Sequence, residues 1–191
     1  MIGNHMKSIA VYCGASNGAK PIYADAARLL ARAPVEHNIA LVYGGGKVGL
    51  MGVIADEVLR LGGEATGVIP RALVEREVGH AGLTRLFVVK DMHERKAMMA
   101  DLAEGFIAMP GGFGTLEELF EMMTWAQLGI HAKPIGLLNT EGFYDGLAAF
   151  ARHQEQEGFV RTAHVELMNI DADAEALVKR LRSLAGPVGM T

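Results

Sequence analysis

Short, strongly apolar segments alternate with helix-length amphipathic segments along the whole chain, and this alternation restricts the possible folds most. The apolar runs are nearly continuous in valine, isoleucine and leucine, as expected for parallel strands covered on both faces. Repeated strand-then-helix units with short connections predict an α/β fold, a Rossmann-like doubly wound parallel sheet with helices on both faces. The predicted strands are Ser8–Cys13, Ile39–Tyr43, Ala65–Ile69, Leu86–Val89, Phe106–Met109, Pro134–Leu138 and Val165–Ile170. The predicted helices are Ile22–Arg32, Leu50–Leu61, Met92–Glu104, Leu116–Leu128, Tyr144–Glu157 and Ala174–Leu184.

The length of 191 residues predicts one domain with a full-sized core. We expect residues 1–6 to be a cloning remnant that ends at a native start, Met6, and residues 7–191 to form the single domain. A net charge of −4 gives no reason to expect binding to nucleic acid or to an anionic membrane. No apolar run is long enough to span a bilayer, and no basic-then-apolar leader opens the chain. The single cysteine, Cys13, excludes an intramolecular disulfide and favours a cytoplasmic location.

Glycine-rich loops follow three of the predicted strands. They are Cys13–Gly18, Gly44–Gly46 and Pro110–Thr115. Because ligands of doubly wound sheets bind beyond the carboxyl ends of the strands, bare amides in these loops, at Ser16 and Gly45 among others, could hold a phosphate. Each loop taken alone is better explained as a structural turn than as a binding site. None has the P-loop spacing, and the second lacks a complete G-x-G-x-x-G, so dinucleotide binding is weakly supported.

The helix predicted from Met92 carries a charged side chain in an apolar position. At 100° per residue, Arg95 falls near the centre of the stripe formed by Met92, Met99 and Leu102, with Lys96 about a quarter-turn away. A buried guanidinium requires a carboxylate or phosphate partner, so this placement predicts an anion. A structural salt bridge, or an arginine whose head reaches water, is the alternative.

The helix predicted after Gly114 carries a second unusual charge. Its core stripe is expected to be Leu116, Leu119, Phe120 and Met123, which leaves Glu118 on the opposite face beside Met122 and Trp125. A carboxylate between apolar side chains suggests cover by a ligand or a second subunit. However, Thr115-Leu116-Glu117-Glu118 also matches a T-x-x-E capping box, and the local pattern alone favours the cap.

Two ordered motifs connect these residues to a known family. Pro110–Glu118 reads P-G-G-x-G-T-x-x-E, and Met92–Lys96 reads M-H-x-R-K. Together with Cys13–Ser16, Tyr43–Gly46, Gly49–Gly52, Thr124–His131 and Lys133–Asn139, they make the chain closely resemble the Lonely Guy family of cytokinin riboside 5′-monophosphate phosphoribohydrolases. The resemblance covers nearly the whole chain. Ala15 and Phe113 differ from the residues found most often at these positions in the family, and the sequence around Glu77 differs more.

The resemblance implies an enzyme, usually dimeric, that releases an adenine-type base from a nucleoside 5′-monophosphate and leaves ribose 5-phosphate. Arg95 and Glu118 would be the catalytic pair. The nucleotide contacts implied are Glu77, Lys96, Gly112, Phe113, Gly114, Thr115, Leu116, Glu117 and Thr124. No metal and no cofactor is expected, and no lysine stands in a pyridoxal-phosphate context that would fit the label "lysine decarboxylase".

Loss of the base places positive charge on the anomeric carbon, which a carboxylate at Glu118 can stabilise or attack, with Glu117 as the substitute. Attack by the carboxylate and activation of water both use the same residue. Three other classes of protein remain open: a non-catalytic binding protein for a nucleotide or phosphorylated cofactor, an enzyme that transfers the ribosyl group to another acceptor, and a structural protein. Release of adenine from AMP would distinguish the first of these from the hydrolase.

Overall fold

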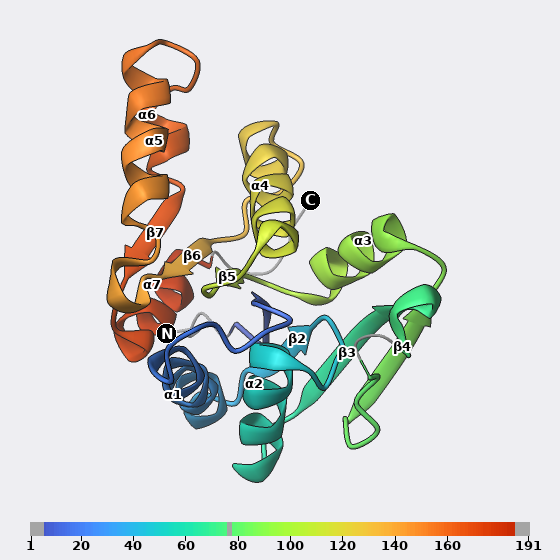
Figure 1. The fold of residues 1–191 in the computed structure, drawn as a ribbon. Coiled ribbons are helices and arrows are strands. Elements are labelled where there is room, and N and C mark those ends of the chain that lie inside the picture. Colours follow the sequence, from blue (N-terminus) through green and yellow to red (C-terminus); the bar gives the residue numbers. More distant parts are fainter. Residues whose placement is uncertain (1–5, 76–77, 186–191) are drawn as a thin grey trace, which may run out of the picture.

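One seven-stranded sheet forms the centre of the computed structural model, which describes residues 6–75 and 78–185 (Figure 1). The strand order is β4-β3-β2-β1-β5-β6-β7, and every neighbouring pair is parallel. The strands are β1 Ser8–Tyr12, β2 Ala40–Tyr43, β3 Ala65–Pro70, β4 Arg85–Val89, β5 Phe106–Ala108, β6 Ile135–Leu138 and β7 Met168–Asp171. The predicted fold class is therefore confirmed.

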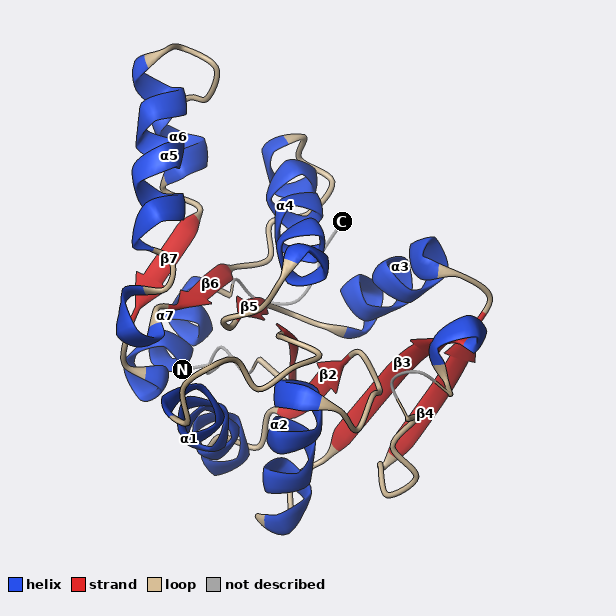
Figure 2. Ribbon diagram, in the orientation of Figure 1, coloured by secondary structure: helices blue, strands red, loops and turns tan. Residues whose placement is uncertain are grey.

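Helices cover both faces of this sheet (Figure 2). On one face lie α1 Ile22–Glu36, α2 Gly49–Arg60 and α7 Ala174–Leu184, which pack with the sheet into one apolar cluster. On the other face lie α3 Met92–Leu102, α4 Phe113–Gln127, α5 Asp145–Gln156 and the short α6 Thr162–Val165, which form a second cluster. Two 3₁₀ turns, η1 Arg71–Leu73 and η2 Thr140–Gly142, complete the described elements. Both faces of the central strands are buried, which explains their continuous apolar composition, whereas the edge strand β4 is largely exposed.

The order of the strands in the sheet creates a crevice at its centre. The chain builds outward from β1 to β4, then α3 carries it back to β5 on the other side of β1. The loops that leave β1 and β5 therefore diverge, and this topological switch point is where open α/β sheets bind ligands. Gly14 N donates to Pro110 O at 3.1 Å and so joins the two loops directly.

Several element boundaries differ from the sequence prediction. Helix α1 continues through Pro34 to Glu36, because a proline near the end of a helix removes only one backbone hydrogen bond. The last strand begins at Met168 rather than Val165, because the residues before it form α6. Helix α4 begins at Phe113 with Gly112 as its N-cap, three residues earlier than predicted.

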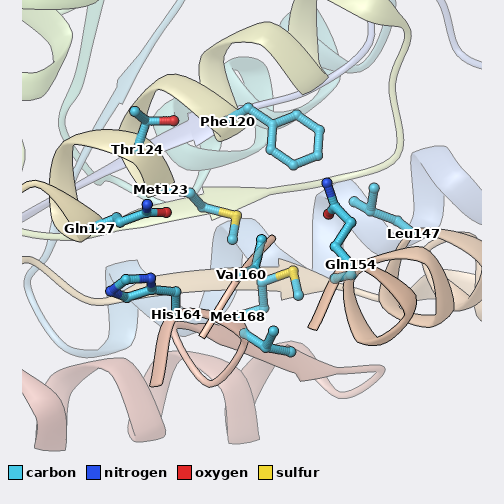
Figure 3. Close-up of a pocket in the computed structure, with 11 residues that line it drawn as sticks. Phe120, Met123, Thr124, Gln127, Leu147, Gln154, Val160, His164 and Met168 are labelled. Atoms are coloured by element: carbon cyan, nitrogen blue, oxygen red, sulfur yellow. The ribbon is translucent and has the colours of Figure 1, made fainter. Parts of the chain in front are cut away.

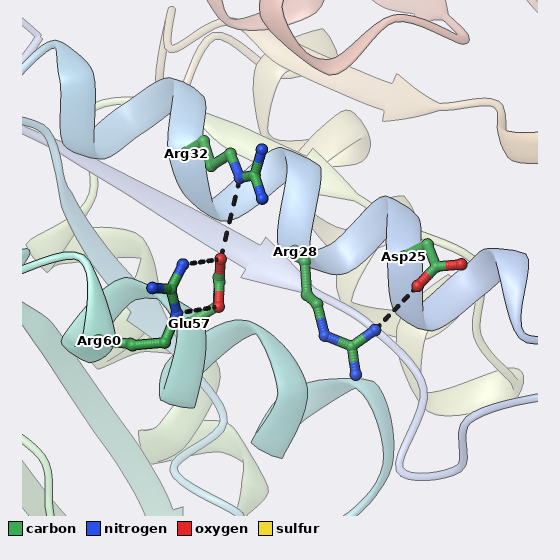
Figure 4. Close-up of polar contacts among 5 residues, drawn as sticks. All are labelled: Asp25, Arg28, Arg32, Glu57 and Arg60. Carbon is green, nitrogen blue, oxygen red and sulfur yellow. Dashed lines mark hydrogen bonds and ion pairs between the residues drawn. The ribbon is translucent and has the colours of Figure 1, made fainter.

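Charged side chains connect α1 with α2 (Figure 4). Glu57, which is only 8% exposed, accepts two hydrogen bonds from Arg60, at 2.7 and 2.8 Å, and lies 3.9 Å from Arg32 of α1. The hydrogen bonds from Arg60 lower the pKa of Glu57 below its ordinary value, against the opposing effect of burial. Glu57 is therefore ionised at neutral pH and stabilises the helix pair.

The amino-terminal edge of the described structure is part of the core. Met6 is 4% exposed and packs in the cluster that includes α1 and α7. The expectation that residues 1–6 are a cloning remnant stays a prediction, with residues 1–5 outside the described ranges. Among the described helices, none combines the length and the apolar character needed to cross a bilayer.

Candidate active site

A cavity of about 240 Å³ opens at the switch point, beyond the carboxyl ends of β1 and β2 and beside the start of α4. The residues that line it come from six segments of the chain. They are Val11, Tyr12, Cys13, Ala15, Gly44, Met51, Leu73, Met92, Arg95, Gly112, Gly114, Thr115 and Glu118. The cavity thus brings together the two residues that the family resemblance implies are catalytic.

Arg95 is 5% exposed and donates to one backbone carbonyl within β3 and to another just after β2. Its Nε donates to Val68 O at 3.1 Å and its Nη2 donates to Gly44 O at 2.9 Å. A Cβ at position 44 would overlap Nη2 and approach Cζ to 3.0 Å, so a glycine is required where the guanidinium crosses the loop. The buried arginine predicted from the apolar stripe is therefore present, with its position fixed by the sheet.

Glu118 lies on the buried face of α4 and not on the opposite face that the sequence pattern indicated. It is 8% exposed, and Thr115, Leu119 and Met122 share its buried face, whereas Phe120 is 41% exposed. The capping-box interpretation is wrong, because Gly112 caps the helix and Glu118 lies in its second turn. A carboxylate buried in this way is available to the cavity and is not needed to start the helix.

The first turn of α4 has the features of an anion site. Gly112, Gly114 and Thr115 line the cavity, and a Cβ at either glycine would meet no atom within 4 Å. The first amides of a helix have no partner within it and carry the positive end of the helix dipole. A phosphate placed at this helix start would therefore be held by backbone N–H groups, as in other phosphate sites.

The charges of the site act on Cys13, which lines the same cavity. Burial raises the pKa of its thiol far above the ordinary value, the charge of Glu118 raises it further, and the charge of Arg95 opposes this. Because only the thiolate is strongly nucleophilic, Cys13 is inert at neutral pH. Burial likewise raises the pKa of Tyr12, with the carboxylates of Glu118 and Glu121 adding to the effect. Glu118 carries the only carboxyl group among the cavity residues that the structure describes.

Lys96 is buried beside Arg95 but binds carboxylates of α4 instead of lining the cavity. Its Nζ lies 2.8 Å from Glu117 Oε1 and 3.3 Å from Glu121 Oε2, and its side chain is 6% exposed. Burial lowers the pKa of Lys96, but the hydrogen bond to Glu117 and the charge of Glu121 raise it above the ordinary value overall. Lys96 therefore clamps α3 to α4, and contacts of Lys96 and Glu117 with a nucleotide stay predictions.

The other predicted contacts are dispersed. Ser16 is exposed and its Oγ accepts from Gly18 N at 3.1 Å, while Gly45 is buried, has a φ of 76° and is not among the residues that line the cavity. Phe113 is 93% exposed and Leu116 is half-buried. Glu77 lies outside the described residues.

Thr124 lines a different hollow, of about 180 Å³, between α4 and the pair of helices α5 and α6 (Figure 3). Apolar side chains and a few polar groups, such as Gln127 and His164, form its walls. Figure 3 shows Phe120 and Met123 facing this hollow, which explains why two residues assigned to the core stripe are not in the core.

Sequence reasoning gave no role in the site to several residues that line the cavity, among them Val11, Tyr12, Met51 and Leu73. Val11 and Tyr12 end β1 directly before a glycine loop, and Met51 lies in the first turn of α2, so their positions were a usable signal. Leu73 lies in the η1 turn between β3 and β4. Nothing in its local sequence indicates that it would reach the site.

Comparison with known proteins identifies the family. The family model described as "Possible lysine decarboxylase" matches residues 51–181. A cytokinin riboside 5′-monophosphate phosphoribohydrolase of Arabidopsis thaliana is 47% identical over 178 residues, 93% of this chain and 82% of that protein. A second Arabidopsis thaliana protein of this name is 48% identical over 180 residues, 94% of this chain and 84% of its own length. The chain belongs to the Lonely Guy family.

Solved structures share the fold of this Lonely Guy family member. A molybdenum cofactor binding protein of Rippkaea orientalis superimposes with a TM-score of 0.71 over 95% of this chain and 98% of that one, at 20% identity. The molybdenum cofactor carrier protein of Chlamydomonas reinhardtii gives a TM-score of 0.68 over 94% and 98%, also at 20% identity. The same fold therefore occurs in proteins named for binding, and the chemistry has to be inferred from the site.

Proposed function

We propose that the protein hydrolyses the N-glycosidic bond of adenosine 5′-monophosphates, N6-substituted ones included, to free base and ribose 5-phosphate. Membership of the Lonely Guy family and the names of the Arabidopsis thaliana relatives support this reaction. The observation that carries it is the presence of Glu118, Arg95 and the start of α4 in one cavity. A carboxylate, a guanidinium and a helix start that can hold a phosphate are the groups needed to cleave the N-glycosidic bond of a nucleoside 5′-monophosphate.

In this proposal the 5′-phosphate binds the amides at the start of α4, with the Thr115 hydroxyl beside it. Arg95 contributes fixed positive charge and orients the ribose phosphate or the Glu118 carboxylate. Because the phosphate is remote from the bond that breaks, its binding energy serves to hold the sugar over the carboxylate. Both kcat and KM should therefore depend on the phosphate.

The bond that breaks joins C1′ of the ribose to the base nitrogen, and the bond that forms joins C1′ to a water oxygen. Positive charge builds at C1′ as the base leaves, and Glu118 stabilises it as an ion pair or as a transient ester. The proton that water loses balances the proton that the base takes up. Val11, Met51 and Leu73 form apolar walls of the cavity, and apolar surroundings strengthen such electrostatic interactions.

The test is release of free adenine from AMP by Glu118→Gln, compared with the wild type and with Glu117→Gln. Loss of the negative charge at position 118 should nearly abolish turnover and leave the melting temperature close to that of the wild type. Glu117→Gln should lose far less, because Glu117 is 56% exposed and binds Lys96. Retention of most activity by Glu118→Gln would reject the assignment, and AMP binding without adenine release by the wild type would favour a binding protein.

We further propose that the protein is a cytoplasmic homodimer. The single, buried, free Cys13 supports a reducing compartment. Large apolar side chains stay exposed on α4 and just after it: Phe120 at 41%, Leu128 at 65% and Ile130 at 62%. Met122 packs in the core, but a second subunit could cover these exposed side chains. Light scattering should give twice the chain mass of 20.4 kDa.

A further inference from the structure

A buried histidine outside the cavity joins three parts of the chain. His80 is 4% exposed, and its Nε2 lies 2.9 Å from Oδ1 of Asp56 on α2. Its Nδ1 accepts a hydrogen bond from Gly82 N at 3.1 Å. A backbone amide is always a donor, so Nδ1 is unprotonated and the neutral ring carries its hydrogen on Nε2, where it donates to Asp56. Both ring nitrogens thus have a defined partner.

The backbone around His80 is bonded to the second glycine loop. His80 N donates to Gly45 O at 3.0 Å, and Lys47 N donates to Val78 O at 2.9 Å. Gly46 and Gly79 form an antiparallel bridge between these two bonds. The imidazole therefore anchors a short ladder, and the ladder holds the loop that follows β2.

The opposite side of that loop holds the catalytic arginine. Gly44 O accepts from Arg95 Nη2 at 2.9 Å, one residue before the carbonyl that accepts from His80. A continuous series of contacts therefore runs from Asp56, through His80 and the Gly44–Gly45 carbonyls, to Arg95. Asp56 is 59% exposed, whereas the His80 side chain is 5% exposed, so the series begins at the surface and ends in the cavity.

We infer that the Asp56–His80 pair is a positioning device that fixes the Gly44–Gly45 loop and thereby the Arg95 guanidinium. His80 does not line the cavity, and it acts on the reaction through Arg95. Catalytic side chains are held in productive geometry by such supporting contacts, and a displacement of about 1 Å costs about 100-fold in rate. The kinetic test of this inference rests on the proposed function. A second test follows the Arg95 side chain directly and does not require turnover.

The kinetic test compares Asp56→Ala with a matched control, Asp25→Ala. Asp25 lies on α1, on the same face of the sheet, and its carboxylate is 61% exposed with a partner, Arg28, at 2.9 Å. Asp56→Ala should lower kcat for AMP about 10-fold to 100-fold, because the loop that positions Arg95 loses its anchor. KM should change much less than kcat, as expected when the lost interaction acts mainly in the transition state. Asp25→Ala should leave kcat and KM unchanged.

Conservative variants separate positioning from a general loss of stability. Asp56→Asn keeps an oxygen that can accept from Nε2, and His80→Gln keeps a donor that can reach Asp56, so both should recover most of the kcat that Asp56→Ala loses. If Asp56→Ala retains the kcat of the wild type, or if Asp25→Ala loses as much, the positioning role is rejected. A rise in KM alone would also overturn it.

A spectroscopic readout does not depend on turnover. The Nε–H of Arg95, donated to Val68 O at 3.1 Å, should give a side-chain resonance that disappears in Arg95→Lys. Asp56→Ala should shift or broaden this resonance, and Asp25→Ala should not. A resonance unchanged in Asp56→Ala refutes the positioning role. If the wild type releases no adenine but the resonance responds, the proposed function fails and the positioning device stands.

Discussion

Replacing Gly44 with alanine tests whether the position of Arg95 controls the reaction. The backbone at Gly44 lies outside the left-handed region, so alanine introduces no backbone strain. Its Cβ, however, would overlap Arg95 Nη2, approach Cζ to 3.0 Å and approach Met51 Sδ to 2.9 Å, whereas ordinary contacts begin at 3.4 Å. The thioether can rotate away, but the guanidinium can escape only by leaving Gly44 O.

The size of the effect follows from this overlap. Clearing the Cβ requires Nη2 to move by roughly 1 Å or more, and a misplacement of that size costs about 100-fold in rate. A 100-fold loss corresponds to about 2.7 kcal/mol of transition-state stabilisation. The new methyl group meets side-chain atoms and no backbone, so the fold should survive, but the buried guanidinium loses a hydrogen bond worth about 1.5–3 kcal/mol. We therefore expect a large loss of kcat together with a moderate fall in melting temperature.

The assay is adenine release from AMP at saturating substrate, with thermal unfolding of each variant. Gly146→Ala is the matched control, because a Cβ at that position on α5 meets no atom within 4 Å. It should retain full kcat. A Gly44→Ala enzyme with a kcat within about 3-fold of the wild type, less than 1 kcal/mol, would refute the role of Arg95 geometry.

Two further predictions concern the substrate and the stability of the fold. Adenosine, which lacks the 5′-phosphate, should turn over far more slowly than AMP because nothing holds its sugar at the start of α4; equal kcat/KM values would contradict the phosphate anchor. Glu57→Gln should lower the free energy of unfolding at pH 7. The pKa of Glu57 lies below 4.5 in the folded state, so its stabilisation is complete above the unfolded value and disappears as the pH falls through the folded one. Urea unfolding at pH 7 and pH 3 should therefore show a difference between wild type and variant that shrinks at low pH, and a constant difference would exclude this origin.

The sheet could be predicted because its strands have a simple signal. The buried parallel strands at the centre of the sheet require continuous apolar runs, and each predicted run overlaps a strand of the structure. The burial of Arg95 could be predicted because Arg95 falls on the apolar stripe of its helix. That stripe faces the interior of the protein, where a charged side chain needs polar partners. The last strand was placed too early because the apolar pattern continues through α6, whose Val165 packs against the same cluster.

The orientation of α4 could not be predicted from its sequence. Phe120 and Met123 are more hydrophobic than Thr115 and Glu118, so the apolar pattern places them in the core. In the structure they face the hollow beside α5 and α6, while Thr115 and Glu118 face the cavity. A helix with apolar contacts on two sides has no unique core stripe, and only the position of neighbouring elements decides which side is buried. The contribution of Leu73 and the Asp56–His80 pair likewise depends on contacts between distant segments.

The most direct test is a crystal structure of Glu118→Gln with AMP bound. The substitution removes the charge that supports cleavage but keeps the shape of the side chain, so the intact nucleotide should remain. We expect its phosphate on the amides of Gly112–Thr115, and its C1′ within about 3.5 Å of the side-chain oxygen at position 118, the separation of reacting atoms. A nucleotide bound with C1′ far from that side chain, or with its phosphate away from the start of α4, would contradict the proposed chemistry.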